Sequence, residues 1–75
     1  MTIEVFSKTA CVQCKMTKDF LNKNNIGFVE YDVESDSAAL RVIQDLGFRS
    51  LPVVFTDSQK WAGYRPDLLS KYKND

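Results

Sequence analysis

The sequence predicts a single α/β domain over residues 1–75, with a four-stranded mixed sheet flanked by three helices. Short runs of β-branched and aromatic residues alternate with segments whose apolar residues recur every three or four positions. A strand–helix–strand unit opens the chain, which implies a parallel pair, because parallel strands need a crossover connection. A turn signal near the end joins two further strands, which implies an antiparallel hairpin. The expected order is therefore βαβαββα.

The first half of the chain is expected to form a strand, a helix and a second strand. Residues 3–6 are a short, largely β-branched run that is typical of a buried strand. Residues 11–24 predict a helix, because their apolar side chains share one face. These side chains are Val12, Met16, Phe20 and Leu21. Two asparagines followed by Gly27 indicate where the helix stops. Residues 28–33 predict the second strand.

The second half is expected to form a helix, a hairpin and a last helix. Three candidate N-caps at residues 35–37 precede the helix, and Gly47 ends it. Its apolar residues have the spacing i, i+3, i+4, i+7 and are Ala39, Val42, Ile43 and Leu46. Residues 53–55 predict a strand, which a turn at 56–58 joins to a short strand near 60–61. Pro66 suits the first turn of the last helix, which carries Leu68, Leu69 and Tyr72.

The composition indicates a protein that binds specific partners rather than polyanions. Ten Lys and Arg balance ten Asp and Glu, so no net charge draws the chain to nucleic acid or to an anionic membrane. The N-terminus lacks a basic start followed by an apolar run, and no stretch approaches membrane-spanning length. We therefore expect a cytoplasmic protein, in which thiols are mostly kept reduced. Its two cysteines are then expected to be catalytic, redox-active or metal-binding rather than a structural staple.

The two cysteines form a Cys11-Val12-Gln13-Cys14 motif where the first loop runs into the first predicted helix. Residues three apart on a helix share a face, so the two sulfurs can approach each other. The helix N-terminus favours a thiolate, and Lys8 and Lys15 add positive charge nearby. We assign Cys11 as the nucleophile and Cys14, one turn into the helix, as the thiol that resolves a mixed disulfide.

Two other interpretations of this motif are a structural disulfide and a metal site. A structural disulfide closing so short a loop would remove only about 2 kcal/mol of unfolded-state entropy, against almost 5 for a long loop. A metal site is disfavoured because the chain has no His and no second Cys pair, so one chain does not supply the usual tetrahedron. Two chains sharing a zinc ion or an iron–sulfur cluster through Cys11 and Cys14 remain an alternative.

Pro52 precedes a strand that the pattern predicts to be buried, although proline lacks an N–H group. One interpretation is simple punctuation at the strand entry. The other is a cis Leu51–Pro52 bond that faces the cysteines and leaves neighbouring backbone groups free to pair with an extended substrate segment. Taken singly, Trp61 is typical of core, Arg49 of a solvated surface and Arg65 of a helix start.

Three segments together resemble the NrdH-redoxin family, whose members are glutaredoxin-like proteins that behave as thioredoxins. The segments are CVQC at 11–14, GFRSLPVV at 47–54 and WAGYRPD at 61–67. The resemblance implies the thioredoxin fold, with Pro52 in the cis form. It also implies reduction by NADPH-dependent thioredoxin reductase and electron delivery to the large subunit of class Ib ribonucleotide reductase. We expect a monomer without a cofactor, whose partner contacts are Lys8, Val12, Gln13, Arg49, Leu51, Pro52, Trp61 and Arg65.

The same resemblance implies weak binding of glutathione. Glutaredoxins typically carry Pro-Tyr between the cysteines and a Gly-Gly pair near the last helix, whereas this chain has Val12-Gln13 and Ala62-Gly63. In the family, hydrogen bonds hold the second segment to the cis-proline loop, and bulky Trp61 is expected to crowd a glutathione groove. The family usually has Ser at Ala62 and Phe at Tyr64. The missing Ser hydroxyl removes a hydrogen bond worth about 1 kcal/mol, so a glutathione-coupled glutaredoxin stays as an alternative.

Overall fold

A computed structural model describes residues 2–73 of the chain. Its helices and strands are β1 (Glu4–Ser7), α1 (Val12–Lys23), β2 (Val29–Asp32), α2 (Ser37–Asp45), β3 (Val53–Phe55), β4 (Lys60–Ala62) and α3 (Pro66–Leu69). A turn of 3₁₀ helix at Ser70–Tyr72 extends α3. The predicted order βαβαββα is confirmed, with boundaries that differ by one or two residues.

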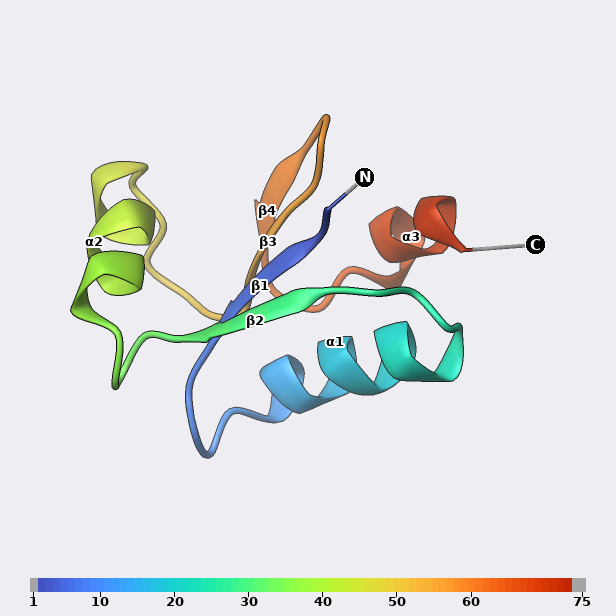
Figure 1. The fold of residues 1–75 in the computed structure, drawn as a ribbon, viewed down its shortest axis with the longest axis horizontal. Coiled ribbons are helices and arrows are strands. Elements are labelled where there is room, and N and C mark those ends of the chain that lie inside the picture. Colours follow the sequence, from blue (N-terminus) through green and yellow to red (C-terminus); the bar gives the residue numbers. More distant parts are fainter. Residues whose placement is uncertain (1, 74–75) are drawn as a thin grey trace.

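The sheet has the strand order β2-β1-β3-β4 and is mixed, as predicted (Figure 1). β1 runs parallel to β2 and antiparallel to β3, which pairs antiparallel with β4. The pairing places Val5 opposite Val54, and Val54 opposite Trp61. Residues that lie directly opposite each other on neighbouring strands point to the same face of a sheet, so these three side chains share one face.

Each face of the sheet has its own apolar core. Leu21 of α1 and Leu69 of α3 pack on the face formed by Val5, Val54 and Trp61. On the other face, Ala39 and Ile43 of α2 pack in a cluster whose other buried members are Phe6, Val33 and Val53. The three helices therefore flank the sheet from both sides, two on one face and one on the other.

Four apolar residues that the helical periodicity predicts to face the sheet are exposed instead. They are Val12, Met16, Val42 and Leu46, with exposed fractions of 75%, 43%, 42% and 52%. The buried row of α1 consists of Cys14, Thr17 and Leu21, and the buried residues of α2 are Ala39 and Ile43. Strands of three or four residues give each helix only a narrow apolar surface to cover. The apolar face that the periodicity predicts for each helix is therefore wider than the face that is buried.

The helix ends follow from local hydrogen bonding. Of the three candidate N-caps before α2, Asp36 is the one used: its Oδ1 accepts from the Ala39 N–H at 3.0 Å. Gly47 ends this helix with φ +85°, a conformation that suits glycine. At the end of α1 it is Asn25, not Gly27, that adopts a left-handed conformation, with φ +57°. No helix within residues 2–73 is long and apolar enough to cross a membrane.

Candidate functional site

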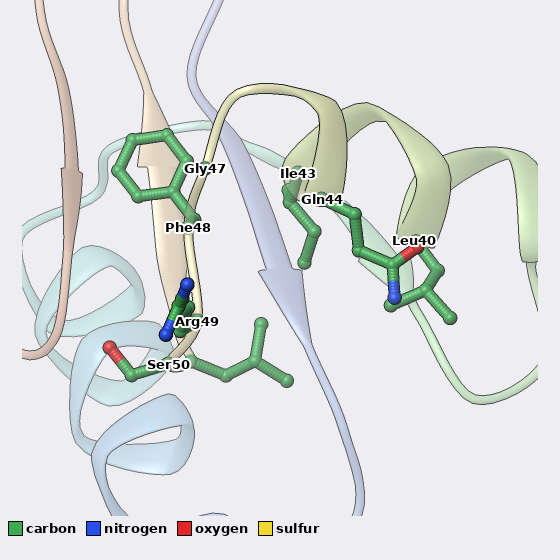
Figure 2. A pocket seen from close by; sticks show the side chains of 8 residues that line it. Leu40, Ile43, Gln44, Gly47, Phe48, Arg49 and Ser50 are labelled. Atoms are coloured by element: carbon green, nitrogen blue, oxygen red, sulfur yellow. The ribbon is translucent and has the colours of Figure 1, made fainter.

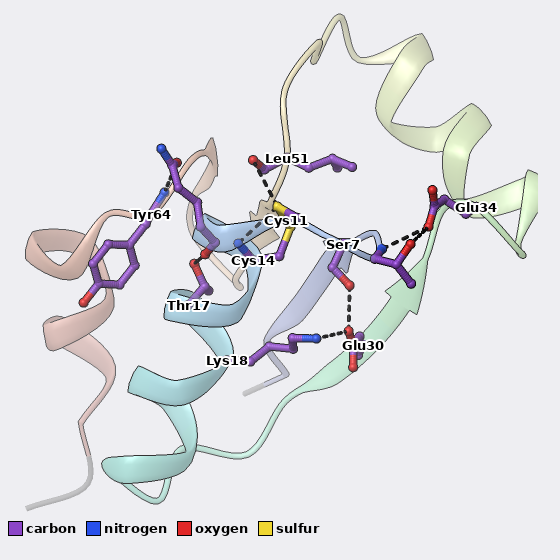
Figure 3. The surroundings of a disulfide bond; sticks show 11 residues. Ser7, Cys11, Cys14, Thr17, Lys18, Glu30, Glu34, Leu51 and Tyr64 are labelled. Carbon is purple, nitrogen blue, oxygen red and sulfur yellow. Dashed lines mark hydrogen bonds and ion pairs between the residues drawn. A yellow bond between two sulfur atoms is a disulfide. The ribbon is translucent and has the colours of Figure 1, made fainter.

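Cys11 and Cys14 form a disulfide bond at the start of α1 (Figure 3). Cys11 is the N-cap of the helix, and its Sγ accepts a hydrogen bond from the Cys14 N–H at 3.2 Å. The Cys11 side chain is partly exposed, whereas Cys14 is only 1% exposed. An incoming thiol therefore has direct access to the Cys11 sulfur and not to that of Cys14.

The loop before β3 faces this disulfide. The Leu51–Pro52 bond is cis, as the resemblance to NrdH-redoxins implies, and Pro52 is buried. The Leu51 carbonyl oxygen lies 3.9 Å from Cys11 Sγ (Figure 3). The loop thus approaches the sulfur through its backbone, while the partner contacts predicted for Leu51 and Pro52 stay predictions.

The segment after β4 closes the third side of the site. The Gly63 N–H donates to the Pro52 carbonyl at 2.7 Å, which confirms the expected hydrogen bonding to the cis-proline loop. The Tyr64 N–H donates to Gln13 Oε1 at 3.1 Å, so the segment also binds one of the two residues between the cysteines. Gln13 was predicted to lie at the site, but its hydrogen bond with Tyr64 was not, because the two residues are 51 positions apart in the chain.

Trp61 and Arg65 occupy different environments within that segment. Trp61 is only 6% exposed and packs in the core with Leu21 and Leu69. The interpretation of Trp61 as core is confirmed, and the partner contact predicted for it stays a prediction. Arg65 is exposed, and its guanidinium donates to both carboxylate oxygens of Asp67, at 3.1 and 2.9 Å. This contact lowers the pKa of Asp67.

Three lysines surround a shallow hollow of about 640 Å³ beside Cys11. Two of them are already paired: Lys15 with Asp19 at 2.6 Å, and Lys18 with Glu30 at 2.7 Å. The hydrogen bond from Lys18 lowers the pKa of Glu30, which also accepts from the buried Ser7 hydroxyl. Lys8 forms no salt bridge within residues 2–73. The positive charge of Lys8 contributes to the lowered pKa of Glu34, and the partner contact predicted for Lys8 stays a prediction.

A second hollow, of about 520 Å³, lies between α2 and the loop that leads to Pro52 (Figure 2). Its lining residues are Leu40, Ile43, Gln44, Gly47, Phe48, Arg49, Ser50 and Leu51. Arg49 is exposed and forms no salt bridge among the described residues. Leu51 lines this hollow, and its carbonyl oxygen also approaches Cys11 Sγ. The hollow is therefore adjacent to the disulfide site.

The loop that delivers Cys11 is anchored by Glu34, a residue that the sequence analysis missed. Glu34 Oε1 accepts from the Thr9 N–H at 2.9 Å and from the Thr9 hydroxyl at 2.6 Å (Figure 3). These two bonds lower the pKa of Glu34. The signal for the contact was the parallel pairing of β1 and β2, because the loops that follow two parallel strands leave the sheet at the same edge.

Acid should weaken this anchor. Because the folded state lowers the pKa of Glu34 below its ordinary 4.5, the stabilisation is complete above that value and is lost as pH falls through the lowered one. We expect Glu34→Gln to reduce the urea midpoint at pH 7, with a difference from the unmodified protein that shrinks progressively as the pH falls below 4.5. Asp57→Asn, in the exposed β3–β4 turn, is the control. A difference that persists undiminished at low pH would show that the charge of Glu34 is not what anchors Thr9.

A metal centre within one chain finds no support in the geometry. Among residues 2–73, no three His, Cys, Asp or Glu side chains gather where they could hold a metal ion. A cluster shared between two chains would have to use Cys11 and Cys14 of each.

Comparison with known proteins gives consistent matches. The glutaredoxin family model matches residues 3–61. The "Glutaredoxin-like protein NrdH" of Lactococcus lactis is 35% identical, over 92% of this chain and 96% of the relative. That of Escherichia coli is 32% identical, over 95% and 88%. The solved structure of NrdH-redoxin from Escherichia coli, described as a glutaredoxin-like protein with a thioredoxin-like activity profile, superposes with a TM-score of 0.95 at 31% identity. The superposition covers 100% of this chain and 99% of the Escherichia coli chain. This match establishes a thioredoxin-like fold.

Proposed function

The chain belongs to the glutaredoxin family and is a thiol–disulfide redox protein with a CxxC disulfide, and from this premise we propose that it supplies electrons to class Ib ribonucleotide reductase. Its own reductant in this proposal is NADPH-dependent thioredoxin reductase. Its client is the large subunit of the ribonucleotide reductase.

The observation that carries the proposal is the full-length similarity to NrdH proteins, at 35% and 32% identity. Three motifs support it: CVQC, GFRSLPVV and WAGYRPD stand in the order that the NrdH-redoxin resemblance requires. The thioredoxin-like activity profile described for NrdH-redoxin from Escherichia coli points in the same direction. A donor of this kind needs an exposed nucleophilic sulfur, and the partly exposed Cys11 meets that need.

The proposed reaction transfers two electrons from the protein to a disulfide of the client. The Cys11 thiolate attacks one client sulfur, forms a mixed disulfide and releases the other client sulfur as a thiolate. Cys14 then loses its proton and attacks Cys11, which re-forms the disulfide of this protein and frees the second client thiolate. The client's two thiolates take up the two protons. Thioredoxin reductase returns two electrons from NADPH to the disulfide.

The hydrogen bond to Cys11 favours this direction of attack. The Cys14 N–H donates to Cys11 Sγ at 3.2 Å, and the positive end of the α1 dipole lies at the same sulfur. Both interactions stabilise a thiolate more than a thiol, so they lower the cost of forming the nucleophile at Cys11. Lys8 and Val12 line the hollow beside this sulfur, and Arg49 lines the hollow that includes Leu51. All three side chains are exposed and are proposed to contact the client.

NADPH oxidation in the presence of a disulfide substrate tests the proposal directly. We expect turnover with thioredoxin reductase and little turnover with glutathione plus glutathione reductase. Added class Ib ribonucleotide reductase should form deoxyribonucleotide at a rate that depends on the concentration of this protein. Activity only with the glutathione system would instead identify a glutathione-coupled glutaredoxin, and the ribonucleotide reductase assignment would lose its support.

A further inference from the structure

Resting on this proposed function, the geometry points to Gln13 as a positioning residue that closes the site to small carboxylate-bearing thiols such as glutathione. Gln13 does so with its side-chain amide oxygen. That oxygen accepts a hydrogen bond from the Tyr64 N–H and lies next to Gly63. Both groups lie beside the disulfide.

The first part of the argument is the hydrogen bond to Tyr64. Gln13 Oε1 accepts from the Tyr64 N–H at 3.1 Å, and both residues have solvent-accessible surface. A backbone N–H at the surface beside a reactive sulfur is a ready donor to a carboxylate, because backbone N–H groups commonly bind such anions. With Gln13 in place, this donor already has an acceptor within the chain. A carboxylate arriving with a thiol must displace it.

The second part concerns the space over Gly63. Gly63 has φ +91°, and a Cβ added there would lie 3.4 Å from Gln13 Oε1. The amide oxygen of Gln13 therefore lies in contact distance of the position that the missing side chain would take. Glycine at this position gives the backbone room for a ligand only if nothing else fills that room. Here the side chain from between the cysteines fills it.

The third part is that this contact completes a ring of interactions at the disulfide, of which Figure 3 draws the contacts of Leu51 and Tyr64. Leu51 O lies 3.9 Å from Cys11 Sγ, and the next residue, Pro52, accepts from the Gly63 N–H at 2.7 Å. Tyr64, which follows Gly63, then binds Gln13, one residue before Cys14. Removing the Gln13 amide opens this ring at its most exposed link and leaves the hydrogen bond between Gly63 and Pro52 in place.

This assignment explains how the chain can exclude glutathione although Ala62 lacks the hydroxyl group usual in relatives. Reduction by glutathione needs two molecules of it. The first thiolate bonds to Cys11 Sγ and expels the Cys14 thiolate, which takes up a proton. The second thiolate attacks the mixed disulfide, leaves as glutathione disulfide and frees the Cys11 thiolate. In each step glutathione must bind beside Cys11. There the Gln13 side chain already accepts the Tyr64 N–H and fills the space next to Gly63 that glutathione would use.

The test replaces Gln13 by Ala and by Glu, with Asn22→Ala as the matched control. Asn22 is an exposed amide side chain on the same helix, at the end away from the disulfide. In Gln13→Ala we expect the Tyr64 amide proton to exchange about fivefold faster, as follows from the loss of one ordinary hydrogen bond. Turnover with glutathione and glutathione reductase should rise at least severalfold, mainly through a lower KM for glutathione. Glu at this position keeps an acceptor oxygen and should restore the amide protection, and Asn22→Ala should change neither quantity.

The possible failures are distinguishable. If Gln13→Ala leaves Tyr64 exchange or glutathione turnover at the level of the unmodified protein, the inference is overturned. It is also overturned if Asn22→Ala raises glutathione turnover equally, since the effect would then be a general loosening of α1. Absence of thioredoxin reductase-supported turnover in the unmodified protein would overturn the proposed function instead, and Tyr64 exchange would still report on the role of Gln13.

Discussion

Replacing Cys11 by Ser is expected to lower turnover in the thioredoxin reductase assay by about a thousandfold or more. The hydroxyl of serine is far less acidic than a thiol, and it forms no disulfide with the client. Cys14 does not substitute for it, because Cys14 is only 1% exposed and lies within the first turn of α1, beneath Cys11. Steady-state NADPH oxidation measures the loss, and the circular dichroism spectrum verifies that the fold is intact.

The matched variant Cys14→Ser should behave differently. Its Cys11 thiol still attacks the client but has no neighbour to resolve the mixed disulfide, so a covalent complex should accumulate at one client per protein. Mass spectrometry under non-reducing conditions detects this complex, and added dithiothreitol should release it. Full activity in Cys11→Ser, or a trapped complex that forms through Cys14, would reverse the assignment of the two sulfurs.

Replacing Leu21 by Ala is expected to reduce the free energy of unfolding by about 2–5 kcal/mol. Leu21 is fully buried and belongs to the core cluster that joins α1 and α3 to the sheet. The substitution removes apolar atoms and leaves a cavity, because the packed core around Leu21 relaxes only partially. In a domain of 75 residues this is a large part of the total stability.

Leu46→Ala is the control for that substitution, because it makes the same chemical change at a side chain that is 52% exposed. We expect it to change the free energy of unfolding by less than about 0.5 kcal/mol. Urea unfolding of both variants measures the contrast. Similar losses at the two positions would mean that α2 packs on the sheet with the wider face that the periodicity predicts.

The order of the elements and the reactive motif could be predicted from residues close together in the chain. The parallel pair follows from the strand–helix–strand order, and Gly47 and Pro66 mark a helix end and a helix start, as expected. The position of Cys11 at the start of a helix is likewise a local property. Such features depend on backbone propensities and on the spacing of apolar residues, which are written into short windows of sequence.

The buried faces of the helices could be predicted only in part: Leu21, Ala39 and Ile43 are buried as expected, and others are not. Val12 and Met16 have helical spacing and an apolar character, yet α1 turns Thr17 toward the core. Thr17 is tolerated there because its hydroxyl donates to the Gln13 carbonyl at 2.9 Å. Which face is buried depends on the shape of the sheet beneath the helix, and no window of local sequence contains that shape.

By itself, then, the sequence determined the fold class, the position of the two cysteines and the loop that carries Pro52. Only the tertiary structure decided which groups surround the sulfurs: the Leu51 carbonyl at Cys11, Glu34 at Thr9 and Gln13 at Tyr64. It also placed Trp61 in the core rather than at the surface. The physical reason is the same for each of them. These contacts join residues far apart in the chain, and their geometry exists only after the strands have paired and the helices have packed against them.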